Sequence, residues 1–248
     1  MNVVPIEQNK PDPGSPLDHA LRYAALGWHV FPVWGAQDGK CRCRRLCKSP
    51  GKHPVEPVVP HGQDDATTDP ATIRRWWLSD PHAGVAVFLA KSGLMAIDID
   101  PRNGGFDTMD TLEAQHGPLV SDVLQYTQGG GEHRVFKLPS GMGLSLPGKL
   151  GPGVDVKVNG YIVLAPTRGL SGVYDWEASS DPLDGAIPSP LPDWLRNLAT
   201  AKQDAPALGA VSSSRYVSES QIRELGDANA KAGGGPEKLG NIDRKSVV

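Results

Sequence analysis

An apolar run that ends in two alternating aspartates is the feature that most constrains the fold of this chain. Residues 94–97 are apolar and are followed by Asp98-Ile99-Asp100. Side chains alternate between the two faces of a strand, so the two aspartates share one face and the neighbouring isoleucines are buried on the other. Residues 154–157 repeat the pattern and present Asp155. Carboxylates gathered from two strands make an all-oxygen site suited to Mg²⁺ or Mn²⁺.

A glycine run lies between these two acidic segments. Gly129, Gly130 and Gly131 are followed by Glu132 and His133. Glycine amides can approach phosphates closely, and a histidine can contact the same phosphates. Taken singly, each segment is more typical of a strand end, a hairpin or a solvent-facing residue. Together they favour an active site for phosphoryl or nucleotidyl transfer.

Eight short segments of the chain together form a recognisable ordered set. They are residues 24–32, Gly51-Lys52-His53-Pro54, 66–69, 76–77, 97–100, 129–133, 153–157 and 160–166. No single segment is specific, but the ordered set resembles the primase-polymerase (Prim-Pol) domain of the archaeo-eukaryotic primase superfamily, which is found in replication proteins of phages, plasmids and other mobile elements. The resemblance extends from about Leu17 to Trp194.

The resemblance implies a role for four polar residues of these segments. It implies that Asp98, Asp100 and Asp155 hold the catalytic Mg²⁺ or Mn²⁺, and that His133 contacts the triphosphate of an incoming NTP or dNTP. Lys157 is a further candidate for phosphate contact, because it shares a strand face with Asp155. The residues expected to bind the nucleotide are Gly129, Gly130, Gly131, His133 and Lys157.

The three cysteines of the chain lie within residues 41–53. Three thiolates and one imidazole, those of Cys41, Cys43, Cys47 and His53, satisfy tetrahedral zinc, whereas an odd number of cysteines is poor material for disulfides. The spacing is not the common two-residue knuckle, but the resembled family carries a similar cluster at this position. We expect structural Zn²⁺; the alternative is a reduced basic loop without metal.

The same segment is strongly basic, although the formal net charge of the chain is −3. That net charge argues against nonspecific coating of DNA, so any nucleic-acid contact requires a local patch. A zinc-bound loop with six Lys or Arg and no acid between Lys40 and Lys52 would meet template or primer phosphates. The residues expected to do so are Arg42, Arg44, Arg45, Lys48 and Lys52.

The periodicity of the chain predicts an α/β (α+β) fold. One helix is expected to begin at Ser15-Pro16, with residues 17, 20, 21, 24 and 25 on its buried face. A second is expected to begin at Asp69-Pro70, with Ile73, Trp76 and Trp77 in the core. A third is expected at residues 108–116. Strands are expected at 29–33, 85–89, 94–100, 123–127, 132–138, 154–158, 161–165 and 173–176, the second and third joined as a pair by residues 91–93. Hairpin spacing after residue 120 predicts a mixed or antiparallel sheet flanked by helices. That agrees with the RNA-recognition-motif-like palm of the resembled superfamily, with a small zinc-binding loop added.

Composition divides the chain into three parts. We expect a flexible arm at 1–14, the Prim-Pol domain at 15–200 with its zinc loop at 40–54, and a linker with a partial helix at 201–248. The last six residues match what one reading frame of a common sequencing adapter encodes. We therefore expect a truncated C-terminus, with a fused helicase or primase-C-terminal region missing. No apolar stretch approaches the 18 residues of a membrane helix and no signal-peptide layout is present, so we expect a cytoplasmic protein.

Three functions remain open at this point. The first is a template-dependent DNA primase and polymerase, a nucleotidyltransferase that serves replication of a mobile element. The second is a non-catalytic zinc-bearing DNA-binding module of a replication initiator, and the third is a metal-dependent nuclease with the same ligands. The intact set of Asp98, Asp100, Asp155 and His133 favours the first.

Overall fold

The computed structural model describes residues 14–139 and 146–204, with side chains as far as Leu198. All of these residues belong to one unit, Met1–Asp204. The expected arm at 1–14, the partial helix at 218–232 and the chain end fall almost entirely outside the described residues. Within the described ranges, no helix is long and apolar enough to cross a membrane.

Two antiparallel sheets and one short hairpin carry the strands of the described residues. The smaller sheet has the order β1-β4-β10, with β1 at Val30–Val33, β4 at Gly84–Phe88 and β10 at Tyr161–Leu164. The larger has the order β11-β6-β7-β5-β9-β8: β11 is Asp175–Trp176, β6 Val123–Tyr126, β7 Glu132–Lys137, β5 Leu94–Ile99, β9 Val154–Lys157 and β8 Lys149–Gly151. The hairpin joins β2 (Ala36–Gln37) to β3 (Lys40–Cys41). The expected combination of antiparallel sheet and helices is confirmed.

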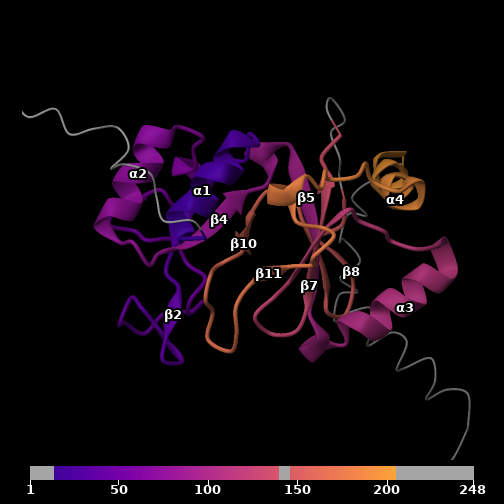
Figure 1. Cartoon of the computed structure of the whole chain (residues 1–248). Helices are drawn as coiled ribbons and strands as arrows, with labels where there is room; N and C mark the ends of the chain where they lie inside the picture. The colour runs from indigo at the N-terminus through magenta and orange to yellow at the C-terminus, as the bar shows by residue number, and fades with distance from the viewer. Residues whose placement is uncertain (1–13, 140–145, 205–248) are drawn as a thin grey trace, which may run out of the picture. The chain divides into compact units, whose positions relative to one another are not determined.

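Helices flank these sheets, with α1 (Pro16–Ala25) and α2 (Pro70–Ser79) beside the smaller sheet and α3 (Gly105–His116) beside the larger (Figure 1). The fourth helix, α4, is Asp193–Asp204, so it reaches into the segment expected to be linker. Single 3₁₀ turns occur at Gly62–Asp65, Ala90–Ser92, Pro101–Asn103 and Pro182–Asp184. Ser15 and Asp69 cap the first two helices, each followed by proline at the first helical position, as predicted.

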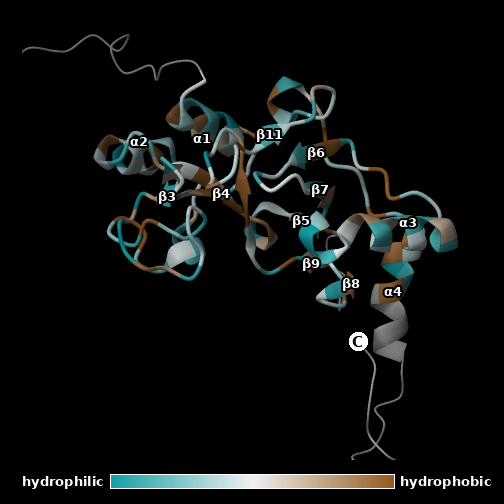
Figure 2. Ribbon diagram, turned by 90° about the horizontal axis from the view of Figure 1, so that it is seen from below, coloured by the Kyte–Doolittle hydropathy of each residue, from teal (hydrophilic) through white to brown (hydrophobic). Residues whose placement is uncertain are grey.

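Strand β5 lies between two apolar cores. Its Met95, Ile97 and Ile99 pack with residues of α3, β9 and α4, whereas Leu94 and Ala96 pack toward the smaller sheet, α1 and α2. The buried strands of that smaller sheet include β4, which is brown along its length in Figure 2. Because the even-numbered face of β5 continues into Asp98, the acidic site begins where the apolar contact between the sheets ends.

The structure corrects three details of the predicted elements. The segments 85–89 and 94–100 do not form a strand pair, because the 3₁₀ turn at Ala90–Ser92 and the left-handed Gly93 direct β5 into the larger sheet while β4 pairs with β1 and β10. Helix α3 begins at Gly105, three residues earlier than expected. On α1 the buried face contains Tyr23, and Ala25 is exposed. The expected core position of Trp76 and Trp77 is confirmed, with exposures of 7% and 1%.

Candidate functional site

A row of polar side chains crosses four neighbouring strands of the larger sheet. Asp98 of β5 stands directly opposite Asp155 of β9 on one side and His133 of β7 on the other. His133 in turn stands opposite Gln125 of β6. Directly opposed side chains in an antiparallel pair have Cβ atoms about 4.5–5.5 Å apart, so these four groups form one continuous row. Register alone therefore brings together three of the predicted site residues.

Asp98 lies at the centre of this row and keeps its negative charge. Its Oδ1 is 3.5 Å from Nε2 of His133, and its side chain is 29% exposed. Burial opposes ionisation, but the hydrogen bond from His133 and the charges of Lys157 and Lys52 hold the pKa of the Asp98 carboxyl below its ordinary value. Asp98 is therefore an anion at neutral pH, which is the state that a metal ligand requires.

Asp100 lies one residue beyond β5, and a backbone hydrogen bond holds it in place. Its amide donates to the carbonyl of Gly153 at 2.7 Å. Gly153 has a φ of +68°, and a Cβ there would lie 2.5 Å from the backbone nitrogen of Gly105, so only glycine allows these segments to meet. Hydrogen bonds from Arg102, together with one from Asn103, lower the pKa of the Asp100 carboxyl. The close approach places Asp100 beside the strand that carries Asp155.

Asp155 is the carboxylate best prepared for a cation. Directly opposed like charges destabilise a strand pair, and here Lys157 relieves the repulsion, with its Nζ 2.6 Å from Asp155 Oδ2 and 3.7 Å from Asp98 Oδ2. Lys149 Nζ is 3.1 Å from Asp155 Oδ1, so each oxygen of this carboxylate faces a lysine ammonium group. Burial opposes ionisation of Asp155, but the two lysines lower the pKa of its carboxyl. An anionic carboxylate that already attracts two cations, in a set of hard carboxylate donors, fits Mg²⁺ or Mn²⁺.

The carboxylates do not yet converge on one point. Within residues 14–139 and 146–204, the one group of three or more potential metal ligands that meet within 4.8 Å is the cysteine cluster described below. Asp98, Asp100 and Asp155 are each drawn toward a basic side chain. Lys157, which we expected to contact phosphate, pairs with Asp155 and lies near Asp98. Its ammonium group supplies positive charge to both carboxylates.

The orientation of His133 is set by a buried glutamine. Gln125 is 0% exposed, and its Oε1 accepts from the Ala165 amide at 3.2 Å while its Nε2 donates to the Val163 carbonyl at 2.7 Å. These backbone partners fix the amide, so Nε2 of Gln125 also donates to Nδ1 of His133 at 2.7 Å. Since Nδ1 accepts, the ring proton of His133 resides on Nε2 and is directed toward Asp98.

The glycine run forms the turn between β6 and β7, and most of its amides bond within that turn. The Gly130 amide donates to the Thr127 carbonyl and the Gly131 amide to Thr127 Oγ1. A Cβ at Gly131 would collide with the carbonyl of Ile99, so this glycine serves the close packing of the turn on β5. Gly129 lies in the lining of a cleft beside Asp98. Of the three glycines, Gly129 is the one placed to meet a ligand.

Asp98 and Asp100 stand between two adjoining clefts. The larger has a volume of about 390 Å³, and its lining also includes Asp155, Lys149 and Asn103. The smaller, of about 70 Å³, is lined by the same two aspartates together with polar and cationic groups. These are Lys52, Arg102, Thr127, Gln128, Gly129, His133, Ser171 and Tyr174. A ligand that spans the two clefts would cross the carboxylates.

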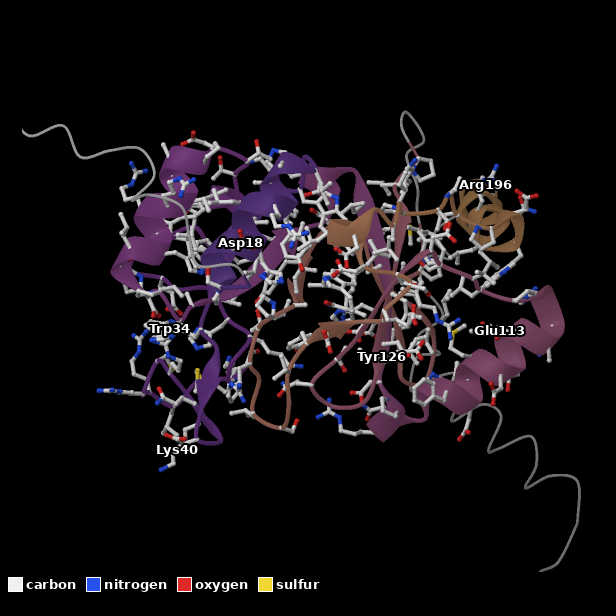
Figure 3. All side chains as sticks on the ribbon, in the orientation of Figure 1. Asp18, Trp34, Lys40, Glu113, Tyr126 and Arg196 are labelled. Carbon is white, nitrogen blue, oxygen red and sulfur yellow. The ribbon has the colours of Figure 1, made fainter. Side chains whose placement is uncertain are left out.

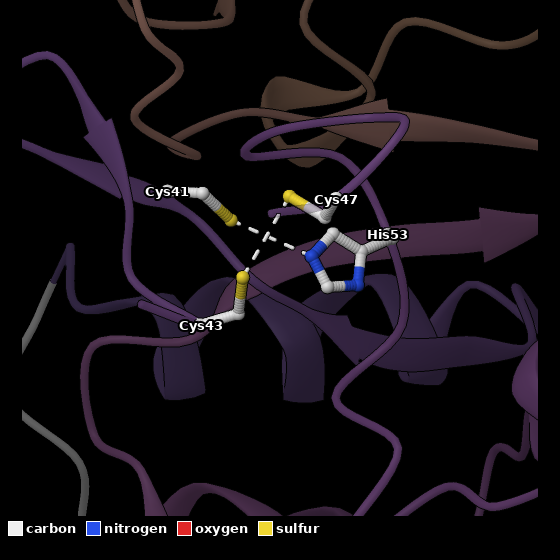
Figure 4. A group of neighbouring side chains, drawn as sticks. All are labelled: Cys41, Cys43, Cys47 and His53. Atoms are coloured by element: carbon white, nitrogen blue, oxygen red, sulfur yellow. Dashed lines mark hydrogen bonds between the residues drawn. The ribbon is translucent and has the colours of Figure 1, made fainter. Parts of the chain in front are cut away.

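A second site is formed by the three cysteines and one histidine, whose side chains point toward one another in Figure 4. Cys41 Sγ lies 3.4 Å from His53 Nε2, and Cys43 Sγ lies 3.6 Å from Cys47 Sγ. With metal–sulfur bonds of about 2.3 Å, the edges of a tetrahedral zinc site are about 3.5–3.8 Å long. These two separations match the edges of a tetrahedral zinc site, and all four ligand atoms lie within 4.8 Å of one another, so the predicted grouping of these residues is confirmed.

The backbone around the cluster is built to hold thiolates. Asp38 and Gly39 both have positive φ, which closes the β2–β3 hairpin and delivers Cys41 at its end. The amide of Gly51 donates to Cys41 Sγ at 3.2 Å and that of Arg45 to Cys43 Sγ at 3.4 Å. Although burial acts against it, the hydrogen bonds at Cys43 lower the pKa of that thiol to about 7. Backbone amides thus donate to two of the three sulfurs, whereas burial and the neighbouring thiols raise the pKa of the Cys47 thiol to about 12.

Glu56 supports the histidine of the cluster from behind. Its Oε1 is 3.0 Å from His53 Nδ1, and its Oε2 accepts from Trp34 Nε1 at 3.0 Å. A carboxylate on Nδ1 leaves the lone pair of Nε2 facing the three sulfurs, which is the usual arrangement of a zinc-bound histidine. Glu56 was not among the predicted site residues, although an acid three residues after His53 is a pattern that could have indicated it.

We expect Glu56→Gln to weaken zinc binding by about ten- to a hundredfold, because without the carboxylate the imidazole ring of His53 is no longer held with Nε2 toward the sulfurs. Zinc affinity can be measured by competition with a chromogenic chelator. Asp64→Asn, which neutralises an exposed acid outside the cluster, is the matched control and should bind zinc as the unmodified chain does. Equal affinities for both variants would remove Glu56 from the site.

The residues expected to contact nucleic acid separate into three groups. Arg44, Arg45 and Lys48 are exposed on the zinc loop. Arg42 instead makes two hydrogen bonds to Asp80, of 2.7 and 3.0 Å, and ties the hairpin to the end of α2. The hairpin is marked in Figure 3 by Trp34 and Lys40. The fifth residue, Lys52, lies in the cleft beside Asp98.

A comparison with known protein families shows to which of them the chain belongs. The profile described as bifunctional DNA primase/polymerase, N-terminal, matches residues 20–194. The chain belongs to this Prim-Pol family. A search of curated proteins found no match. Membership implies DNA primase/polymerase activity of the nucleotidyltransferase class, DNA and nucleotide substrates, and the use of divalent metals.

Proposed function

We propose that this chain is the catalytic domain of a template-dependent primase-polymerase, and that the row formed by Asp155, Asp98 and His133 is its nucleotidyl-transfer site. The observation that carries the proposal is the register of β5 with β7 and β9, which sets two carboxylates and a histidine side by side. Asp100 completes the acidic set at the border of the two clefts. The larger sheet would then serve as the RNA-recognition-motif-like palm.

The acidic residues would hold the metals and the histidine would hold the nucleotide. Bound Mg²⁺ or Mn²⁺ supplies charge neutralisation for in-line attack of a 3′-hydroxyl on the α-phosphate and for the departing pyrophosphate. Asp98, Asp100 and Asp155 are all anions at neutral pH and provide the ligands. His133 presents its Nε2 proton to the cleft, where it can donate to a phosphate oxygen.

A nucleotide triphosphate would displace Lys157 from the carboxylates. In the described structure Lys157 Nζ lies between Asp98 and Asp155, where like charges would otherwise oppose one another. Metal ions would replace that charge and free the ammonium to contact phosphate. The proposed phosphate role of Lys157 is thus compatible with its present ion pairs.

The zinc loop would contribute to binding of template or primer. Arg44, Arg45 and Lys48 are exposed on it, and exposed cations that neutralise phosphates provide affinity without sequence preference. Zn²⁺ would be structural, because Cys41, Cys43, Cys47 and His53 fill four tetrahedral positions. We further propose a role in the replication of a phage, plasmid or other mobile element, together with a helicase region in the same chain or in trans.

The two alternative functions are less well supported by the site. A non-catalytic DNA-binding module gains nothing from two directly opposed carboxylates, whose repulsion Lys157 has to offset when no metal is bound. A metal-dependent nuclease would use the same carboxylates. It has no requirement for the second, smaller cleft, with its histidine and cationic lining, beside the metal ligands.

Primer extension with the purified chain tests the proposal directly. A labelled primer on a longer template, supplied with Mn²⁺ or Mg²⁺ and with either deoxynucleotides or ribonucleotides, should be lengthened. Omission of the primer tests initiation. Shortening of the DNA without any requirement for nucleotides would identify a nuclease, and DNA binding without either reaction would identify the binding module.

We expect His133→Ala to raise the Michaelis constant for the nucleotide or to lower turnover by about ten- to a hundredfold, since a hydrogen bond to a charged group contributes about 1.5–3 kcal/mol. Separate titrations with Mn²⁺ and with a nucleotide should show weaker nucleotide binding and nearly unchanged metal binding. His82→Ala, at an exposed histidine, is the matched control. A collapse of metal affinity with intact nucleotide affinity would make His133 a metal ligand and contradict the phosphate role.

A further inference from the structure

Lys52 occupies an unusual position between the two sites. It immediately precedes His53 of the cysteine cluster, yet it lines the smaller cleft together with Asp98, His133 and Gly129. Its ammonium also acts on Asp98 through space, since it is among the charges that favour the ionised carboxylate. The sequence placed Lys52 with the exposed cations of the zinc loop. The structure places it with the catalytic groups.

The backbone holds Lys52 in this position from two directions. Its amide donates to the Ser49 carbonyl at 3.1 Å, and its carbonyl accepts from the Tyr161 hydroxyl at 3.1 Å. Tyr161 begins β10 of the smaller sheet, so the hydrogen bond anchors the zinc loop to the body of the domain. Lys52 is half-buried, which limits the directions open to its side chain.

Lys52 differs from the other cations around the carboxylates. Lys149 and Lys157 pair with Asp155, and Arg102 pairs with Asp100. Over residues 14–139 and 146–204, no ion pair or hydrogen bond of the Lys52 ammonium is found. A half-buried cation without an anionic partner, in a cleft that also contains a histidine proton donor, is suited to an anionic ligand.

We propose that Lys52 is a nucleotide-binding residue, which contacts the triphosphate of the incoming nucleotide in the smaller cleft beside the metal ligands. This inference rests on the proposed nucleotidyl-transfer function. Phosphate oxygens would meet the Lys52 ammonium and the His133 Nε2 proton in the same cleft, while the three carboxylates border it. The cysteine cluster would thereby act on nucleotide binding, because His53 is the next residue in the chain.

Binding of a fluorescent deoxynucleoside triphosphate in the presence of Mn²⁺ tests this inference apart from catalysis. Lys52→Met should weaken triphosphate binding by about ten- to a hundredfold, while Lys52→Arg, which keeps the charge, should retain part of the affinity. The affinity for primer-template DNA should change by less than about threefold, because a single phosphate contact contributes only a small part of the total affinity for DNA. Lys137→Met removes an exposed lysine at the far end of β7 and should match the unmodified chain.

The outcomes separate the inference from the function on which it rests. Unchanged triphosphate binding in Lys52→Met, or a selective loss of DNA binding, overturns the assignment of Lys52 and leaves the function in place. Failure of the unmodified chain to bind any triphosphate overturns both. Zinc content and thermal unfolding are measured for every variant. If Lys52→Met loses zinc, the comparison of Lys52→Gln with Lys52→Arg tests the inference. A nucleotide contact requires the uncharged Lys52→Gln variant to bind triphosphate more weakly than the charged Lys52→Arg variant.

Discussion

Replacement of both Asp98 and Asp100 by alanine is expected to reduce nucleotide incorporation to the background level. Each carboxylate is an anion at neutral pH, and both lie at the border of the two clefts. Loss of two ligands removes metal-assisted catalysis, an effect of several kcal/mol on the barrier. Primer extension with Mn²⁺ or Mg²⁺ measures the loss. Ile97 and Ile99 stay buried at 0% exposure, so the fold should be retained.

A matched double variant distinguishes loss of the site from loss of charge. Asp107→Ala together with Asp110→Ala removes two exposed aspartates from α3 and should leave incorporation unchanged. Thermal unfolding and DNA binding of both double variants should resemble those of the unmodified chain. Retained incorporation by a folded Asp98→Ala, Asp100→Ala variant would contradict the assignment of these two carboxylates to the nucleotidyl-transfer site.

Local patterns predicted the elements of this fold well, but their pairing less well. The caps at Ser15 and Asp69 and the alternation of Asp98 with Ile97 and Ile99 are properties of a few adjacent residues, and the structure has them as expected. The partners of β4 and β5 depend on distant segments. Both strands are almost wholly buried, so their hydrophobicity did not indicate which sheet each would join.

The candidate site shows the same division between local and distant information. Alternation along β5 and β9 indicated which faces the carboxylates share, but not that Asp98 and Asp155 stand directly opposite each other. Gln125 reads in the sequence as an ordinary polar residue of a strand. Its importance arises from contacts with Val163 and Ala165, about forty positions away, which no local pattern contains.

The basic loop was predicted as one surface because its charges are adjacent in the sequence. In the structure Arg42 is directed to Asp80, and Lys52 to the cleft that contains Asp98. The turn at Gly51, with a φ of +71°, separates the exposed loop from Lys52. A charge run in a compact, metal-ligating loop therefore need not present all of its charges on one face.

Removal of the cysteine cluster is expected to open the loop without unfolding the domain. Cys41→Ser together with Cys43→Ser should abolish binding of about one zinc per chain, which metal analysis of protein purified under reducing conditions would show. The two hydrophobic cores contain none of the four ligands, so the sheets should persist. Trypsin should then cleave after Arg44, Arg45 or Lys48 at least about tenfold faster, which corresponds to about 1.4 kcal/mol of lost local stability.

The matched control for this loop is Leu46→Ser, because Leu46 is fully exposed and its side chain has no group that could ligate zinc. That variant should keep its zinc and its resistance to trypsin. In the double cysteine variant, binding of triphosphate and of DNA should both weaken, since His53 positions Lys52 and the exposed arginines lie on the same loop. Freshly purified chain without bound metal, or a double variant as resistant to trypsin as Leu46→Ser, would contradict a structural zinc site.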